Sequence, residues 1–545
     1  MPESDVKTPV PRTDEKQSLE RGDSSHSDGV EIPRHTSFVN VMVLVTACLG
    51  GFLYGFAANA ISGTVAQPTF IAKFLTNSQA LQLTDAMLGG FLGGAMVGSL
   101  LQAPIANKFG RRIANAVAAA IVIFAAAISS GAVNVAMFIA GRVLTGVGAG
   151  MVLANSPVYM SEVAPPHNRG MLVGLQGVGI VTAYIMAAIC ALGFNFVEAD
   201  YQWRLVFIVL CGVACLLLLS LWFLPESPRW LMEKGREAEA IQVLEYLHKT
   251  KADPYNTLAR AEAVQIKAQV DTERALPKGF IYIFSTPHLR KRAFISIILW
   301  TMGQGTGITA IANLIPTFMA GLGFGTVVQL GLGVVWSVCA VIGCGINVVL
   351  LDRIGRRKLL IIGGFGMAAI LSTMAALVKY YLGTPAGPGV RALVALYFIM
   401  GAFFTSTIEC TSYVYGSEIW PTHLRSEGST ITYLSFFGNA IAYSAPVSVG
   451  LNNIGWKFYM ILIVVTVVTT IMIVLWFPET MGLTLEEINV TFGDKVELEL
   501  KDALYNETET LDASKRMLLH TLSNMNDSST YNIIGKGNNE DNLMI

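Results

Sequence analysis

The feature that most constrains this chain is the recurrence of apolar runs about 20 residues long, the length a helix needs to cross a bilayer. Hydrophobic residues make up 53% of the 545 residues, charged residues only 14%, and the mean hydropathy is +0.54. A soluble protein carries about 25% charged residues. The sequence therefore predicts a polytopic membrane protein surrounded by lipid. With a net charge of −1, the protein has no positive electrostatic field that would attract a nucleic acid.

The apolar runs predict an all-α membrane protein with twelve transmembrane helices. Helix boundaries read from a sequence carry an error of several residues. The expected spans are 38–62, 88–106, 113–133, 137–156, 170–192, 204–224, 293–318, 326–350, 358–379, 392–416, 429–450 and 456–477.

Three motifs occur twice, once in each half of the chain, which indicates an internal repeat. They are "NKFGRR" and "DRIGRR" (107–112, 352–357), "SEVAPPHNRG" and "SEIWPTHLRSEG" (161–170, 417–428), and "PESPRW" and "PETMGL" (225–230, 478–483). The repeat predicts two six-helix halves that share one plan, a known transporter architecture. We expect a disordered cytosolic tail, an N-terminal half, a cytosolic linker with short helices, a C-terminal half and a cytosolic tail, at 1–37, 38–224, 225–292, 293–477 and 478–545.

Lysine and arginine are unevenly divided between the two sets of loops. Since cytosolic loops carry the excess of positive charge, the richer set is expected to face the cytosol, with both chain termini. That set holds Lys108, Arg111, Arg112, Arg169, Arg353, Arg356, Arg357, Lys358 and Arg425, whereas the other holds mainly Lys73, Arg204, Lys379, Arg391 and Lys457.

The repeated motifs, with "GRVLTGVGAG" and "PVYMSE", resemble the sugar porter family of the major facilitator superfamily, and fungal-type sugar transporters in particular. The resemblance covers roughly residues 38–490. It implies the major facilitator fold and alternating-access transport of a sugar or other small polyhydroxylated solute, either by symport with protons or by facilitated diffusion. We expect the protein to function as a monomer in the plasma membrane. An internal membrane remains open.

Acids and arginines recur together at the expected cytosolic helix ends, and the resemblance implies that they tie the two halves together in one conformation. An arginine fork can bind a carboxylate and also cap helix-terminal carbonyl groups. The alternative is that these charges only set the topology. The family usually has aspartate where this chain has Asn107, so we expect a weaker lock in the N-terminal half. The network comprises Arg111, Arg112, Arg142, Glu162, Arg169, Glu226, Asp352, Arg356, Arg357, Glu418, Arg425 and Glu479.

The resemblance also implies a central cavity in which amides and aromatic rings bind the solute, because an amide offers hydrogen-bond donors and an acceptor to hydroxyl groups. This chain departs from the family pattern: Gly303 replaces one glutamine, Asn313 and Leu314 replace a tyrosine pair, and Gly177 takes another glutamine position beside Gln176. Fewer amides and aromatics favour an altered substrate. An interhelical hydrogen bond remains the alternative for Gln304. The candidate substrate-binding residues are Gln304, Thr309, Asn313, Gln176, Tyr413 and Asn439.

The first span carries Ala57 where proton-coupled family members have an aspartate. Glu409 is the candidate replacement, because it lies eight residues before Glu418, about 12 Å along a helix and close to the bilayer middle. An ionisable group at that depth is a functional hypothesis by default. Burial disfavours the charged form, so Glu409 could carry a proton. It could equally bind substrate directly or buttress the seventh span.

Two other functions remain open: a carrier or exporter of a non-sugar metabolite, and a transporter-like nutrient sensor. The seven cysteines lie inside apolar runs, and we expect no metal site and no cofactor. The sequence contains no nucleotide-binding, metalloprotease or triad motif. We expect no enzymatic activity.

Overall fold

The structure is a computed structural model that describes residues 37–75, 80–165, 169–197, 201–250, 253, 255–274, 276–309, 325–381, 388–445, 447–494, 502–506 and 508–510. Within these residues every regular element is a helix. Ten described helical spans are long and apolar enough to cross a membrane: Phe38–Thr64, Gln82–Phe109, Arg111–Ser130, Val135–Val163, Arg169–Phe194, Gln202–Phe223, Thr326–Ile354, Arg356–Tyr381, Pro388–Glu418 and Lys457–Trp476.

The remaining two expected spans, 293–318 and 429–450, fall on α14 (Pro287–Gly305) and α20 (Arg425–Ser444). Both helices begin with charged residues and carry further polar side chains, which lower their hydropathy. They nevertheless pack among the apolar helices, α14 against α22 (Lys457–Trp476) and α20 against α5 (Ala80–Phe109). The predicted all-α membrane fold is therefore confirmed, and the twelve-helix plan is consistent with it.

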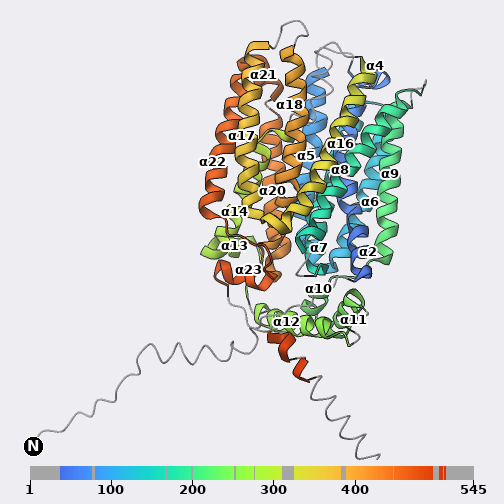
Figure 1. The fold of residues 1–545 in the computed structure, drawn as a ribbon. Helices are drawn as coiled ribbons and strands as arrows, with labels where there is room; N and C mark the ends of the chain where they lie inside the picture. The colour runs from blue at the N-terminus through green and yellow to red at the C-terminus, as the bar shows by residue number, and fades with distance from the viewer. Residues whose placement is uncertain are drawn as a thin grey trace, which may run out of the picture.

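Figure 1 shows the two halves side by side. The N-terminal half contains α2 (Phe38–Ala47), α3 (Leu49–Thr64), α4 (Pro68–Phe74), α5, α6 (Arg111–Ser130), α7 (Val135–Val163), α8 (Arg169–Phe194) and α9 (Gln202–Ser220). The C-terminal half contains α14, α16 (Thr326–Ile354), α17 (Arg356–Tyr381), α18 (Pro388–Phe404), η3 (Thr405–Glu409), α19 (Cys410–Glu418), α20, α21 (Val447–Ile454) and α22.

Short helices gather at one end of the bundle, which we call the linker end (Figure 1). Trp230, Leu244 and Ile266 form part of a small core of their own among three of these helices. The short helices are α10 (Pro228–Glu233), α11 (Glu237–His248), α12 (Thr257–Glu273), α13 (Phe280–Ser285) and α23 (Leu485–Phe492).

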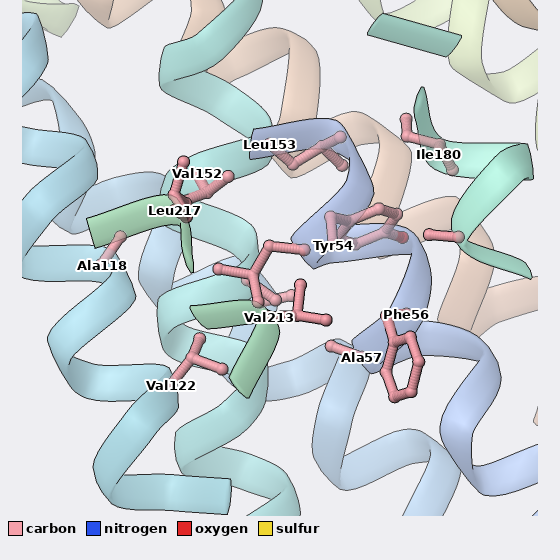
Figure 2. Close-up of a cluster of buried hydrophobic side chains, with 14 of the residues drawn as sticks. Tyr54, Phe56, Ala57, Ala118, Val122, Val152, Leu153, Ile180, Val213 and Leu217 are labelled. Carbon is pink, nitrogen blue, oxygen red and sulfur yellow. The ribbon is translucent and has the colours of Figure 1, made fainter. Parts of the chain in front are cut away.

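Glycine in the first span allows helix backbones to approach closely. A Cβ added at Gly55 of α3 would lie 2.2 Å from the carbonyl oxygen of Ile180 on α8, so only glycine fits there. Small residues at such interfaces are how membrane helices gain packing energy without a hydrophobic driving force. Figure 2 shows part of the buried core around α3, with Ala57, Val152 of α7 and Val213 of α9 among its side chains.

The sequence repeat is also a repeat of contacts. The Tyr159 hydroxyl donates to the carbonyl oxygen of Pro225 at 2.9 Å, and the Tyr415 hydroxyl donates to that of Pro478 at 3.0 Å. Each bond ties the fourth span of its half to the segment that follows the sixth. The two halves therefore close their linker ends in the same way.

Candidate functional site

A glutamate caps the same helix in each half at the linker end. Glu226 accepts hydrogen bonds from the backbone N–H groups of Arg111 and Arg112, the first residues of α6. Glu479 accepts the corresponding bonds from Arg356 and Arg357 of α17. A carboxylate at a helix N-terminus is stabilised by the orphan N–H groups and the helix dipole. The second arginine of each "GRR" motif therefore contributes its backbone to the network.

The glycine of each "GRR" motif makes this cap possible. Gly110 has φ +103° and Gly355 has φ +98°, a region that glycine adopts without strain. A Cβ at Gly110 would also lie 2.3 Å from Glu226 Oε2, and one at Gly355 would lie 2.6 Å from Glu479 Oε2.

The first arginine of each motif binds a buried acid. Arg111 forms a fork with Glu162, with Nε to Oε2 at 3.1 Å and Nη2 to Oε1 at 3.2 Å. Arg356 lies 3.4 Å from Glu418 and 2.9 Å from Asp352. Each acid also accepts a hydrogen bond from a hydroxyl group of the "PES" or "PET" motif in the same half. The Ser227 hydroxyl donates to Glu162 at 2.6 Å, and the Thr480 hydroxyl donates to Glu418 at 3.2 Å.

Polar contacts cross between the halves at this end, and three of them involve charged side chains or repeated motifs. Arg425 of α20 lies 3.4 Å from Glu162 of α7. The backbone N–H of Met171 donates to Asp352 at 2.8 Å. The Asn107 amide donates to Glu427 at 2.9 Å. These contacts therefore join the two halves at the linker end.

The repeat is not symmetric across the interface. Glu162 and Arg425 pair, whereas their counterparts Glu418 and Arg169 do not pair with each other within the described residues. Arg169 is 3% exposed, and its Nε and Nη1 atoms have no hydrogen-bond partner in the described part of the chain.

The linker helices are attached by charge as well. Arg229 of α10 lies 2.6 Å from Glu486 of α23. Burial alone would raise the pKa of Glu486, but the Arg229 guanidinium outweighs it and holds that pKa below its usual range. His248 of α11 lies 2.8 Å from Glu262 of α12. Burial would lower the pKa of His248, but Glu262 outweighs it and raises the pKa above 6.5, while His248 in turn holds the pKa of Glu262 below 4.5.

Arg142 does not belong to this network, and that prediction is wrong. It lies seven residues from the start of α7 and 21 residues before its linker end, about 30 Å away along the helix. Its Nη1 donates to the carbonyl oxygen of Ala57 at 2.9 Å, and its guanidinium stacks on Phe91 at 4.5 Å. The side chain is fully buried, and Nε and Nη2 have no hydrogen-bond partner among the described residues. The Arg142 guanidinium therefore meets a backbone carbonyl group at Ala57 and no carboxylate among the described residues.

A cavity lies between the halves, and both contribute to its walls. The space between these walls amounts to about 770 Å³, part of which is open solvent. Its polar side chains come from α3, α8, α14 and the residues that follow it, α16, η3 and α19. The lining residues are Tyr54, Ala58, Asn59, Leu88, Phe91, Leu92, Val181, Tyr184, Gln304, Ile308, Thr309, Trp336, Phe404, Thr405, Glu409, Tyr413 and Phe436.

Glu409 ends a π-helical turn, η3, inside the span formed by α18 and α19. Single π-helical turns inside α-helices are frequent at functional sites. Here Thr405, Ser406 and Thr407 each donate a hydroxyl to a carbonyl oxygen of the preceding turn, which competes with the regular helix ladder. Helix α16 presses against the turn, because a Cβ at Gly343 would lie 2.1 Å from Thr405 Oγ1. The sequence around Glu409 therefore builds the turn that positions it.

Glu409 has one hydrogen bond in the described structure. The Tyr413 hydroxyl donates to its Oε1 at 3.1 Å. Across the cavity, Thr309 donates to Oε1 of Gln304 at 2.5 Å, and the Asn59 amide donates to the carbonyl oxygen of Tyr184 at 2.9 Å.

Aromatic rings connect the two halves along the cavity. Tyr54 of α3 lies 6.2 Å from Phe91 and 6.4 Å from Phe436 of α20, measured between ring centroids. Trp300 of α14 continues the series, 4.6 Å from Phe436 and 5.3 Å from Tyr413. Tilted and edge-on pairs at such distances are the favoured aromatic geometry. The aromatic residues that the sequence pattern lacks in the seventh span are thus partly supplied by other helices.

The cavity brings together Gln304, Thr309, Tyr413 and Glu409 of the predicted site residues. Gln176 is fully buried against α3, where a Cβ at Gly51 would lie 2.9 Å from its Cδ. Asn439 lines a separate apolar groove. Asn313 lies outside the described residues.

Sequence reasoning missed Asn59, Tyr184 and Thr405 as cavity residues. Asn59 lies on the expected first span, two residues after Ala57. That offset turns its side chain about 200° round the helix from the position where proton-coupled family members have an aspartate. Tyr184 and Thr405 carry no motif. An aromatic or hydroxyl residue near the middle of an expected span was the one available signal.

Two helical halves around a polar and aromatic cavity, joined at one end by polar contacts, define a membrane carrier. The family model described as "Sugar (and other) transporter" matches residues 43–492, and the chain belongs to this family.

Three known proteins illustrate the similarity. The MFS-type transporter criB of Aspergillus cristatus is 28% identical over 453 residues, 83% of this chain and 92% of criB. The high-affinity glucose transporter of Kluyveromyces lactis is 28% identical over 475 residues, 83% of this chain and 84% of that protein. The structure of the proton:xylose symporter XylE, from E. coli, bound to 6-bromo-6-deoxy-D-glucose is 26% identical, with a TM-score of 0.75, and covers 84% of this chain and 100% of XylE.

Proposed function

We propose that this chain carries a small hydroxylated solute, a sugar or polyol, across the membrane by alternating access. The observation that carries the proposal is the cavity between the halves, in which Asn59, Gln304, Thr309 and Thr405 offer amide and hydroxyl groups. The glucose transporter and the xylose symporter similar to this chain handle solutes of that class.

The charge network is proposed to hold one of the two conformations. Arg425–Glu162 and Asn107–Glu427 join the halves only while the linker end is closed. The contacts within each half, such as Arg111–Glu162, can persist when the halves rock. This division supports a movement of two rigid halves about the cavity.

Glu409 is proposed to couple transport to protons. It is the one acidic side chain among the described cavity residues. A buried carboxyl exchanges a proton with whichever side the cavity faces. Loss of the pH dependence of uptake in Glu409→Gln would support this role, and an intact pH dependence would exclude it.

The linker end is proposed to face the cytosol, in the plasma membrane, with both termini inside. The arginines of both "GRR" motifs lie at that end, in agreement with the positive-inside tendency. Labelling of an introduced cysteine at exposed Lys108 in intact and in permeabilised cells tests the orientation. If an impermeant reagent labelled this cysteine in intact cells, the linker end would face the outside of the cell instead.

The test of the main proposal is uptake of labelled sugars and polyols by a transporter-null cell, with and without a protonophore. Gln304→Leu should reduce uptake, because a buried amide that bonds a substrate hydroxyl is replaced by an apolar group of similar size. Asn439→Leu is the matched control, since Asn439 lies outside the cavity. Equal uptake by both variants would remove Gln304 from the site. Cavity accessibility from one side only, under every condition, would exclude a carrier.

A further inference from the structure

The cavity wall carries one carboxyl group and no basic group. Glu409 supplies the carboxyl, and no lysine, arginine or histidine is among the described residues that line the cavity. Its carboxylate takes one hydrogen bond, from Tyr413, and forms no ion pair in the described part of the chain. An ionised carboxylate offers about four acceptor positions on its two oxygens. Most of the acceptor capacity of Glu409 is therefore available to a solute.

The ionisable groups that interact with Glu409 are neutral hydroxyls and a thiol. They come from each neighbouring element that contributes such a group: Tyr54 of α3, Tyr184 of α8, Cys344 of α16, Tyr413 of α19 and Tyr433 of α20. No cation is among them. Arg142 stacks on Phe91 and is not itself part of the cavity wall. The described protein supplies no counter-ion, so an ionised Glu409 requires one from the solute.

The rings around the cavity suit a cation. Tyr54, Tyr184, Trp336 and Phe436 line it along with Tyr413, whereas the Phe91 ring already stacks on the Arg142 guanidinium. A ligand cation within about 6 Å of a ring centroid is attracted by the electron-rich face of the ring. Amides, which neutral sugars need for their many hydroxyls, are represented by Asn59 and Gln304 among the described lining residues.

We propose that the solute of this carrier is a hydroxylated amine whose ammonium group binds Glu409, and that it is exchanged for a proton. The inference rests on the proposed carrier function and specifies its substrate class. The hydroxyl groups of the solute lie toward Gln304 and Thr309, and the ammonium group lies between the carboxylate and the aromatic rings.

The exchange follows from competition for one carboxylate. When the cavity is empty, Glu409 holds a proton and the buried site is neutral. When the amine enters as R–NH₃⁺, the Glu409 O–H bond breaks, its proton leaves to the water on that side, and the carboxylate binds the ammonium. When the amine leaves on the other side, a proton from that side protonates Glu409 again. Each cycle therefore exchanges one protonated amine for one proton that crosses in the opposite direction, and no net charge crosses the membrane.

The experiment compares glucamine, a polyol with one terminal amine, with sorbitol, which has a hydroxyl in its place. The full-length protein is reconstituted in liposomes that enclose a pH-sensitive dye. Uptake of each labelled probe and the pH inside are measured together. Wild type should take up glucamine with an apparent affinity about 10- to 100-fold higher than sorbitol, the range expected for a hydrogen bond to a charged group. A glucamine gradient should move protons in the opposite direction.

Glu409→Gln keeps the size of the side chain and removes its charge. It should remove the preference for glucamine and the counterflow of protons while sorbitol uptake persists. Glu237→Gln is the control, because Glu237 is exposed on α11, away from the cavity. This substitution should change neither the preference for glucamine nor the counterflow of protons.

The outcomes separate this inference from the proposed function. Equal uptake of glucamine and sorbitol by wild type, or proton flow in the same direction as glucamine, would overturn the inference and leave the carrier. A preference for glucamine that survives in Glu409→Gln would assign the ammonium to another group and overturn it too. Uptake of neither probe, with the cavity accessible from one face only, would overturn the carrier function itself.

Discussion

Asn107→Asp gives the sharpest test of how the linker end is held closed. The family pattern has aspartate at this position, and from the sequence alone the asparagine predicts a weaker lock. The structure gives the opposite expectation for the variant, because the Asn107 amide donates to the Glu427 carboxylate of the other half at 2.9 Å. An aspartate there would face Glu427 with a like charge and would remove its donor.

The size of the effect follows from this geometry. Two like charges about 4 Å apart repel by about 4 kcal/mol at the effective dielectric constant of a protein surface. Glu427 is 9% exposed and Asn107 is half-buried, so solvent screening and side-chain movement reduce this value. We expect a net cost of about 2 to 4 kcal/mol for the closed linker end, a shift of about 30- to 700-fold in the conformational equilibrium.

The assay is the distance distribution between spin labels at Lys108 and Arg353, which are exposed at the linker ends of α5 and α16. Asn107→Asp should increase the population with the longer distance. Glu427→Gln in the same chain should restore the short distance, because a glutamine amide can donate to the aspartate. If Asn107→Asp alone instead shortens or narrows the distribution, the contact with Glu427 does not control closure and the reasoning is refuted.

Three further predictions concern packing, buried charge and pH. Gly343→Ala should lower stability by about 1 to 3 kcal/mol, since its Cβ would clash with the π-helical turn, whereas Gly333→Ala on the same helix meets nothing within 4 Å; equal melting temperatures in detergent would contradict this. Arg142→Met should leave the melting temperature unchanged or raise it, because it replaces a buried charge without an ion pair in the described structure by an apolar group; a clear decrease would reveal a partner. The His248–Glu262 contact should stabilise the linker helices fully between about pH 4.5 and 6.5 and weaken as pH rises through the raised pKa of His248, measured by proteolysis of the linker at several pH values. His248→Gln should abolish that pH dependence, and an unchanged profile would exclude the pair as its cause.

Much of the fold could be predicted from local properties of the sequence. The length and apolarity of a span are determined by consecutive residues, and so ten of the twelve expected spans reappear as membrane-length helices. The two remaining ones, α14 and α20, carry polar residues that are buried between helices, and hydropathy alone cannot detect that compensation. The duplicated motifs likewise predicted the paired acids and arginines of the two halves.

The cavity depended on helix rotation, which a one-residue error in register changes by about 100°. Gln304 and Glu409 were identified because a motif and a membrane depth located them. Gln176 faces α3 instead, and Asn439 faces a separate groove. Arg142 was assigned to the wrong end of its helix, because its motif is shared with the family while its depth in the membrane is not part of the motif.

The sequence by itself determined that the chain crosses the membrane many times, that it is built from two related halves, and that acids and arginines recur at matching positions in both. These properties follow from hydropathy and repetition, which are local. Only the tertiary structure decided that Asn107 donates to Glu427, that Arg142 lacks a carboxylate at Ala57, and that Glu409 faces the cavity from a π-helical turn. Those relations join residues far apart in the chain, and they depend on how whole helices pack and rotate against one another.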